Sequence, residues 1–362
     1  MTQVFVRAAE LACALGTDLD AAAERLSGEP ATPERNTAAG GAWPYCAIPV
    51  AEADWMKRAE AIARTVAENL RHRAALPPRE WSALPCIAGS SSNSVGVWDR
   101  DGYASLRPPR EFSRSLADWF GVRGPAMMVN TACTSGLSAL DLALGLVRAG
   151  GFRDALVLGV EFANRLTVAG FAGLELLSPT AARPCDRDRD GLVLGEALGA
   201  VLVSAEPRGW GIAALASRVD AGGLTGPAPN GVVIADTMRS ALATARWPEA
   251  AVDLIKLQAG GARLADLAEA RALRDLFAAP PKAVSLKGAL GHTLGASGPA
   301  ELALLLRCLE RGRVPGTWGF ATPDEELGLA PSGGDAQGVR RVLFNLSGFG
   351  GNVMSLALQK AD

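Results

Sequence analysis

The sequence contains very little histidine and tyrosine, with two of each among 362 residues. His72 lies in a basic stretch (Leu-Arg-His-Arg, 70–73) that is typical of a solvated helix face, so we assign it no role. Imidazole chemistry therefore has one candidate, His292. A three-histidine metal site is arithmetically impossible, and a mixed cysteine–histidine zinc site lacks the usual local ligand pairs. We expect no metal.

Long apolar runs, basic clusters and paired cysteines are also missing. No uninterrupted apolar run reaches the ~18 residues of a membrane span, and the N-terminus lacks the pattern of a secretory signal. Lysine and arginine are scattered and the formal net charge is −2, which excludes a nucleic-acid-binding footprint. The six cysteines show no CxxC spacing, which favours reduced thiols in a cytoplasmic protein. They are Cys13, Cys46, Cys86, Cys133, Cys185 and Cys308.

Apolar residues are abundant, at 49%, and the length is sufficient for two core-bearing units. Apolar runs and helical periodicity alternate in both halves, which is typical of α/β folds with mixed, mostly parallel sheets. The predicted strands are 4–6, 84–88, 154–159, 197–204, 211–216, 252–257, 283–286 and a hairpin of 341–346 with 353–359. The predicted helices are 19–26, 53–76, 110–119, 137–147, 234–245, 264–277 and 299–309. Residues 28–48 are predicted to be a loop, and the Gly/Ser-rich run 89–94 a flexible one.

The segment Thr131–Gly136 (Thr-Ala-Cys-Thr-Ser-Gly) places a cysteine between an apolar run, Met127–Val129, and a predicted helix. Backbone N–H groups and the helix dipole at such a turn favour thiolate over thiol. Cys133 is therefore a candidate nucleophile for acyl transfer. The alternative is a buried, inert cysteine, which is the commoner situation for this residue type.

Two glycine-rich segments downstream offer further parts of such a site. In Lys287–His292 (Lys-Gly-Ala-Leu-Gly-His) the histidine precedes a helix, where the dipole favours a neutral imidazole whose Nε2–H can donate to a carbonyl or enolate. Lys287 would add positive charge. Gly348 and Gly350, on either side of Phe349, permit positive φ and let N–H groups approach a ligand as an oxyanion hole. A structural histidine and a plain hairpin turn are the alternatives.

Four blocks taken together resemble the β-ketoacyl-acyl-carrier-protein synthase family. They are the nucleophile turn at 131–135, the family's Pro-Phe-Asp…Arg-Asp-Gly…Gly-Glu block at 184–196, its Lys…Gly-His…Gly-Ala…Gly…Glu segment at 285–301 and its Asn-Ser-Phe-Gly-Phe-Gly-Gly tail at 345–351. Their order and spacing hold from about residue 84 onward, and the chain is shorter than typical members. The resemblance implies a thiolase-like layered fold of two similar α/β halves, residues 1–207 with Cys133 and residues 208–362 with Gln258, His292 and the Gly348–Gly351 loop.

The resemblance also implies a role for each site residue. Cys133 would receive an acyl chain from the phosphopantetheine arm of a carrier protein, so no cofactor of the chain's own is expected. His292 would help to stabilise the enolate formed when malonyl loses CO₂. Lys287, paired with Glu269, would tune the pocket. Backbone N–H groups of Cys133 and Phe349 would hold the oxyanion, and Phe349 would gate the acyl pocket.

One segment departs from the family pattern. The family's His-Gly-Thr-Gly-Thr-Pro-Leu-x-Asp corresponds to Gln-Ala-Gly-Gly-Ala-Arg-Leu-Ala-Asp at 258–266, aligned through Asp266. The second histidine has become Gln258, and the threonines that in the family bind the pantetheine amides have become Gly260 and Ala262. A glutamine amide can donate to an enolate but cannot act as an acid or base near neutral pH. Loss of one oxyanion donor typically slows a reaction ~100–1,000-fold, so elongation at full rate is not expected.

A competing motif starts at Asp186. The pattern Asp-x-Asp-x-Asp-Gly at 186–191 matches the first half of a calcium-binding EF-hand loop. The twelfth position, which requires a bidentate acid, is Ala197, and a strand-like run follows instead of a helix. We therefore expect a salt-bridged turn near the pocket.

Two functions remain. The chain is either a competent β-ketoacyl synthase that performs decarboxylative Claisen condensation through Cys133, Gln258 and His292, or a chain-length-factor-like partner of an active ketosynthase. Such partners shape the tunnel in polyketide, aryl-polyene or fatty-acid-type systems. Known chain-length factors lose the cysteine, which this chain keeps. The joint loss of the histidine and both threonines fits relaxed catalytic demand, so we favour the partner. An acyl carrier protein and a homodimer or heterodimer are expected in both cases.

Overall fold

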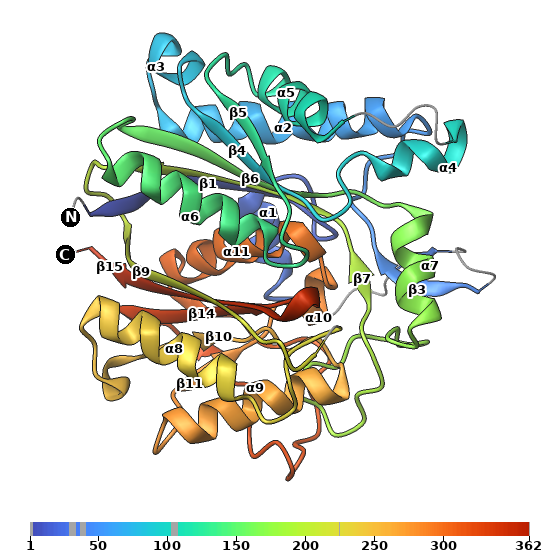
Figure 1. The fold of residues 1–362 in the computed structure, drawn as a ribbon, viewed down its shortest axis with the longest axis vertical. Coiled ribbons are helices and arrows are strands. Elements are labelled where there is room, and N and C mark those ends of the chain that lie inside the picture. Colours follow the sequence, from blue (N-terminus) through green and yellow to red (C-terminus); the bar gives the residue numbers. More distant parts are fainter. Residues whose placement is uncertain (1–2, 29–33, 37–40, 103–107, 224, 362) are drawn as a thin grey trace.

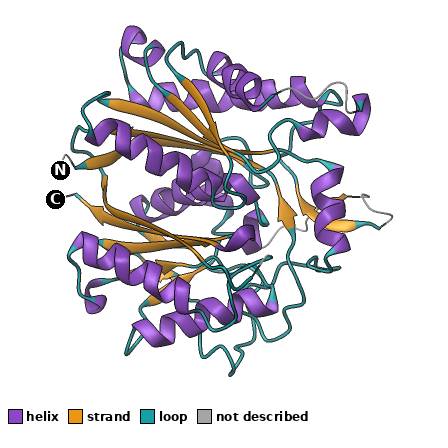
Figure 2. Cartoon of the chain, in the orientation of Figure 1, coloured by secondary structure: helices purple, strands orange, loops and turns teal. Residues whose placement is uncertain are grey.

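The computed structural model describes residues 3–28, 34–36, 41–102, 108–223 and 225–361. Helices and strands form alternating layers, with helices outside, a curved sheet on either side of the centre, and further helices between the sheet layers (Figures 1 and 2). None of the helices in these ranges combines the length and the apolar character needed to cross a bilayer.

In the described chain, ten strands form one hydrogen-bonded sheet that consists of two five-stranded arrays. The first array runs β5 (Ala126–Val129), β4 (Cys86–Gly89), β6 (Asp154–Glu161), β8 (Ala197–Ser204), β1 (Val4–Ala12). The second runs β11 (Lys282–Val284), β10 (Leu254–Lys256), β14 (Arg341–Ser347), β15 (Asn352–Lys360), β9 (Trp210–Val219). The arrays join where β1 pairs with β9.

The two arrays have the same topology. In each, the three strands farthest from the junction are parallel, and the two nearest it are antiparallel to their neighbours. If strands are numbered by chain order within an array, both arrays read 3-2-4-5-1. The mixed sheet of two similar α/β halves that the sequence predicts is therefore confirmed. The boundary between residues 207 and 208 stays a prediction.

Three helix layers cover the arrays (Figure 1). Helices α2 (Trp55–Ala74) and α5 (Pro109–Trp119) lie on the outer face of the first array, and α8 (Val232–Ala245) and α9 (Arg263–Leu276) on that of the second. Helices α1 (Leu19–Arg25), α6 (Ser135–Arg148) and α11 (Ser297–Glu310) fill the centre. The shorter elements are α3 (Pro78–Ser82), α4 (Trp98–Asp101), α7 (Arg165–Gly173), α10 (Lys287–Leu290), β2 (Glu34–Asn36), β3 (Trp43–Cys46), β7 (Leu194–Gly195), β12 (Arg313–Val314), β13 (Gly334–Asp335) and 3-10 turns at 95–97, 249–251, 294–296 and 349–351.

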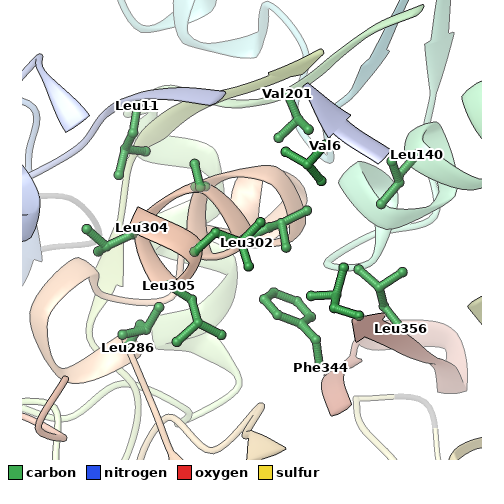
Figure 3. Packing of buried hydrophobic residues seen from close by; sticks show 14 of the residues in the cluster. Val6, Leu11, Leu140, Val201, Leu286, Leu302, Leu304, Leu305, Phe344 and Leu356 are labelled. Carbon is green, nitrogen blue, oxygen red and sulfur yellow. The ribbon is translucent and has the colours of Figure 1, made fainter. Parts of the chain in front are cut away.

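The central layer contains the largest apolar cluster, in which Leu302 and Leu305 of α11 pack with Leu140 of α6, Val201 of β8 and Phe344 of β14 (Figure 3). Burial of each such side chain contributes about 1.5–3 kcal/mol. Helix α11 lies so close to the sheet that a Cβ at position 199 of β8 would fall 2.3 Å from the backbone nitrogen of residue 300, so only glycine fits there. This packing fixes the start of α11 against β8.

Most predicted strands and helices are confirmed within a few residues. The loop predicted at 28–48 is wrong in part, because β2 and β3 form there and β3 pairs with β7, while residues 29–33 and 37–40 lie outside the described residues. The flexible run predicted at 89–94 is fixed instead, since the Glu161 carboxylate accepts hydrogen bonds from the backbone and hydroxyl groups of Ser91 and Ser92. The buried acid at the end of β6 thus orders a polar loop.

Candidate functional site

The duplication brings Cys133 and His292 together. Cys133 lies between β5 and α6, and His292 lies between β11 and α11, which are the equivalent strand and helix of the second array. The two helix starts touch, because a Cβ on Gly136 would fall 2.3 Å from Cδ of Pro299. Although 159 residues separate them in the chain, the Sγ of Cys133 lies 3.2 Å from Nε2 of His292. Each half supplies one member of the pair.

A tight turn presents Cys133 at the start of α6. Ala132 has a φ of 53°, in the left-handed region that a non-glycine residue rarely adopts. The Ser135 hydroxyl donates to the Ala132 carbonyl over 2.5 Å and accepts from the Thr131 N–H over 3.0 Å, which holds the strained turn closed. Such strain persists where the surroundings over-determine the conformation, as at a nucleophile turn.

The burial of Cys133 opposes the thiolate that the helix start is expected to favour. Burial raises the pKa of the Cys133 thiol to about 11, and the Phe349 N–H and the Lys287 ammonium lower it only in part. The side chain is 5% exposed, so the cost of removing a thiolate from water exceeds the favourable effect of the helix start. Burial therefore opposes the predicted effect of the turn and favours the neutral thiol.

His292 is neutral, as the sequence predicts, and its backbone is clamped. Burial, followed by the positive charges of Lys287 and Lys256, holds the imidazole pKa well below its usual value. The His292 N–H donates to the Val193 carbonyl over 2.7 Å, and its carbonyl accepts from the Gly195 N–H over 3.1 Å. Strand β7 of the first half therefore orients a residue of the second half.

Lys287 does not pair with Glu269. Its Nζ donates to one oxygen of Glu301 on α11, and to the Ser297 hydroxyl over 3.3 Å. Glu269 lies on α9 and accepts the N–H groups of Gln258 and Ala259 over 2.8 and 2.9 Å. The expected pairing is wrong because Glu269 is occupied by the backbone of the 258–262 loop.

Two buried carboxylates of α9, Glu269 and Asp266, hold the 258–262 loop. Asp266 accepts the N–H groups of Gly260, Gly261 and Cys185, each with a bond of 3.0–3.1 Å. Burial raises the pKa of Asp266 to about 6 and that of Glu269 to about 7. Asp266 and Glu269 therefore support this loop through hydrogen bonds to its backbone.

Some of these residues line a cavity of about 460 Å³, whereas Lys287, Glu269 and Glu301 lie outside its lining. Cys133, Gln258, His292, Gly348 and Phe349 line it, and residues 222–223, 225–229 and 262–266 form much of its wall. In the described chain, no group hydrogen-bonds to the buried Oε1 of Gln258. The amide that replaces an expected imidazole is therefore available to a ligand in the cavity.

Of the two glycines that flank Phe349, only Gly348 lines the cavity. A Cβ on Gly348 would lie 2.8 Å from Cβ of Cys133, so the loop approaches Cys133 as closely as glycine allows. Gly350 turns the backbone with a φ of 73° and does not line the cavity. The Phe349 ring stacks on Phe171 with centroids 5.0 Å apart and planes 20° apart. This stacked pair closes one wall of the cavity.

Sequence reasoning missed Leu192, which occupies space beside the altered loop. A Cβ at position 260 would fall 2.7 Å from Cδ2 of Leu192 and 3.3 Å from Cδ of Lys287. A threonine at 260 would therefore require Leu192 to move. Leu192 therefore fills the space beside Gly260, which no local pattern in the sequence indicates.

The Asp-x-Asp-x-Asp-Gly segment is a structural turn. The Asp186 carboxylate accepts the N–H groups of Ala321 and Thr322, both over 2.7 Å, and that of Asp188 over 2.9 Å. Within the described ranges, no group of three or more potential ligands could hold a metal ion.

The duplicated arrays and the cysteine at the start of the central helix define a thiolase-like protein. Residues 45–208 match the family described as β-ketoacyl synthase, N-terminal domain, and residues 211–321 match its C-terminal domain. The chain belongs to the β-ketoacyl synthase family.

Relatives with curated names come from polyketide systems. The chain is 34% identical over 269 residues to the tetracenomycin polyketide synthase ketoacyl synthase alpha subunit of Streptomyces glaucescens, covering 67% of this chain and 62% of the relative. It is 32% identical over 309 residues to the granaticin polyketide putative β-ketoacyl synthase 1 of Streptomyces violaceoruber, covering 76% and 73%. The matches span 62–65% of the length of the first three relatives.

Solved structures share the fold over the whole chain. A β-ketoacyl synthase from Burkholderia phymatum superposes with a TM-score of 0.87 and 22% identity, covering all of both chains. A ketosynthase, ApeO, in complex with its chain length factor, ApeC, from Xenorhabdus doucetiae gives a TM-score of 0.82 and 24% identity, covering 99% of this chain and 98% of the other.

Proposed function

We propose that this chain is a chain-length-factor-like, ketosynthase-type subunit that binds carrier-protein-bound acyl thioesters and shapes their tunnel beside an active ketosynthase. One observation supports this above the others. The cavity keeps the Cys133–His292 contact, at 3.2 Å, but carries the amide of Gln258 where condensation needs a second imidazole. An amide donates a hydrogen bond without exchanging protons near neutral pH, so the site favours binding over turnover.

The state of the free thiol supports the same proposal. Burial raises the pKa of Cys133 to about 11, so little thiolate is present at neutral pH. The donors around the sulfur, Nε2 of His292 and the Phe349 N–H, can instead hold the carbonyl oxygen of an acyl thioester. The substrate arrives on the phosphopantetheine of an acyl carrier protein, so we propose no cofactor bound by the chain itself.

We propose pairing with another ketosynthase subunit through the β5 edge. Strand β5 ends the first array, its four residues are only half-buried, and Leu142 on the neighbouring helix α6 is 39% exposed. An unpaired strand edge with apolar side chains is a template for another strand. Neither nucleic acid nor a membrane is proposed as a partner.

Co-expression tests the pairing. The chain and a neighbouring active ketosynthase are expected to purify as a one-to-one complex, measured by affinity capture followed by size exclusion with light scattering. A homodimer of this chain that is indifferent to the synthase would contradict the partner function. Differential tagging of the two subunits separates the two outcomes.

A second function has one specific observation in its favour, the intact contact between Cys133 and His292. A competent synthase would transfer the acyl group to Cys133: the bond from the carbonyl carbon to the carrier sulfur breaks, a bond to Sγ forms, and the thiol proton ends on the carrier sulfur. Decarboxylative Claisen condensation with malonyl-carrier would follow. Incubation of the chain alone with acyl- and malonyl-carrier, followed by mass spectrometry, distinguishes this enzyme from a partner.

We also propose a cytoplasmic location. It is supported by the six cysteines, which are all unpaired and buried, as is usual in a reducing compartment.

A further inference from the structure

Lys256 is a buried lysine in a predicted apolar strand, two residues before Gln258. Its side chain is 0% exposed, and its Nζ donates to Oε2 of Glu301 over 2.6 Å and lies 4.0 Å from the centre of the Phe344 ring. Burial of a charge is costly unless partners compensate it. A lysine at this position therefore requires a physical explanation beyond packing.

Glu301 is shared between two lysines. One carboxylate oxygen accepts from Lys256 and the other from Lys287. Burial would raise the pKa of Glu301, but the two ammonium groups outweigh it and hold that pKa below its usual value. Burial lowers the pKa of Lys256 to about 8, so this lysine is still charged at neutral pH. Lys256, Lys287 and Glu301 form a buried triad of two cations and one anion, whose net charge is about +1.

A short chain of polar atoms connects this charge to His292. The Lys287 Nζ donates to Oγ of Ser297 over 3.3 Å, Oγ of Thr293 lies 3.1 Å from Oγ of Ser297, and Oγ of Ser297 lies 3.5 Å from Nδ1 of His292. The serine accepts from the ammonium, which leaves its own hydrogen for a neighbour. The titratable groups around these polar atoms are Cys133, Glu161, Lys256, Glu269, Lys287 and Glu301.

The two imidazole tautomers face this charge differently. With the proton on Nε2, the lone pair of Nδ1 points toward Ser297 and the Lys287 ammonium behind it. With the proton on Nδ1, an N–H dipole points at the same cation, which is electrostatically unfavourable. If Lys256 were absent, Glu301 would neutralise Lys287 and this preference would fall.

We propose that Lys256 is a positioning residue for His292: by sharing Glu301 it leaves a positive charge behind Ser297 that holds the imidazole as a neutral Nε2–H donor facing Cys133. In this form His292 can donate to a thioester or enolate oxygen but cannot take the thiol proton. The inference deepens the proposed function, on which it rests for the identity of the acceptor.

The wild-type protein gives the first test. The chain has two histidines, so ¹⁵N spectra of histidine-labelled protein contain two imidazoles, and His72→Gln assigns them. We expect His292 to remain neutral and protonated on Nε2 from pH 6 to 8. An imidazolium, or a proton on Nδ1, in that range would overturn the proposal.

Charge variants give the second test. Lys256→Met should raise the titration midpoint of His292 by about one pH unit or populate the Nδ1–H form. Lys256→Met combined with Glu301→Gln leaves Lys287 as the one charge of the triad, and should restore the wild-type spectrum. An unchanged spectrum in the single variant, or no recovery in the double variant, would contradict the proposal. A purely structural role predicts no such recovery.

Ser297→Ala tests the link without altering any charge. It should weaken the Nε2–H preference, whereas Ser355→Ala, at another fully buried serine, should leave His292 unchanged. Equal spectra for the two variants would overturn the proposal even if Lys256→Met does not fold. These measurements use the chain without carrier or partner, so their failure is separate from a failure to co-purify with a synthase.

Discussion

Cys133 is held as a thiol by its surroundings although it lies at the start of a helix. The dipole of α6 and the nearby N–H groups favour a thiolate by at most a few kcal/mol, whereas burial at 5% exposure opposes it more strongly. The sequence indicates the turn but not the depth at which the fold buries it. For this reason the position of Cys133 at a helix start was predictable, whereas the effect of burial on its pKa was not.

Alkylation measures this charge directly. Because the pKa of Cys133 is about 11, its labelling by iodoacetamide should rise about tenfold per pH unit between pH 7 and 10. Mass spectrometry of the Cys133 peptide follows the rate, and Cys133→Ala removes the signal. A plateau near neutral pH would mean that the resting protein holds a thiolate.

We expect Gln258, which lines the cavity, to limit decarboxylation. Gln258→His introduces an acid–base group into the cavity that His292 also lines, and should raise the rate of malonyl-carrier decarboxylation by about tenfold or more. The conversion of malonyl- to acetyl-carrier is measured by mass spectrometry, with Gln258→Asn as the control. Equal rates for the two variants would show that residue 258 does not limit decarboxylation.

The loops that carry the site are set by glycines and by buried carboxylates. Gly348→Ala would place a Cβ 2.8 Å from Cβ of Cys133, so the loop or the thiol must move. We expect a loss of about 1–3 kcal/mol in unfolding free energy and a changed alkylation rate at Cys133. Gly226→Ala, at a cavity residue whose Cβ would have nothing within 4 Å, should change neither. Urea unfolding and labelling of both variants decide the comparison.

Asp266 makes the 258–262 loop sensitive to pH. Its pKa of about 6 lies above the value of an unfolded chain, so the folded protein binds the proton more tightly. The stability from this group is fully present below about pH 4 and is lost as the pH rises through 6. From pH 5 to 8, wild-type stability should therefore fall by about 1 kcal/mol more than that of Asp266→Asn. If the unfolding free energies of the wild type and Asp266→Asn, measured in urea, change equally from pH 5 to 8, the assignment of this pKa to Asp266 is contradicted.

Among the helices and strands, those with a clear local sequence pattern were predicted better than those that depend on distant partners. The apolar periods of α2, α9 and β8 were sufficient to predict these elements, because each buries one clear face or the whole strand. Helix α7 and strand β3 were missed because they are short and depend on partners far along the chain. The Lys287–Glu301 pair was missed for a related reason: sequence spacing does not tell which of two glutamates the fold brings to the lysine.

The whole molecule explains why the site lies where it does. Two arrays with the same strand order place Cys133 and His292 at equivalent strand–helix junctions, and the contact between α6 and α11 brings the junctions together. The alternation of strands and helices predicted two similar halves. The continuity of the sheet through β1 and β9 was not predicted, because it depends on three residue pairs at the strand ends.

A surface variant tests the proposed pairing with a ketosynthase subunit through the β5 edge. Leu142 is an exposed residue of α6, the helix that contacts the edge strand β5, so Leu142→Glu should prevent the proposed pairing by placing a charge in the interface. Val232→Glu, at an exposed apolar residue on α8, is the matched control and should assemble normally. Size exclusion with light scattering measures both. A Leu142→Glu protein that assembles like the wild type would place the interface elsewhere.

We propose that this protein binds acyl thioesters but does not condense them on its own. The direct measurement is the condensed product formed from acyl- and malonyl-carrier by the purified chain, by a neighbouring ketosynthase, and by the two together. We predict no product at an ordinary rate from the chain alone, and a change in product length when it joins the synthase. Condensed product formed at an ordinary rate by the isolated chain would contradict the account.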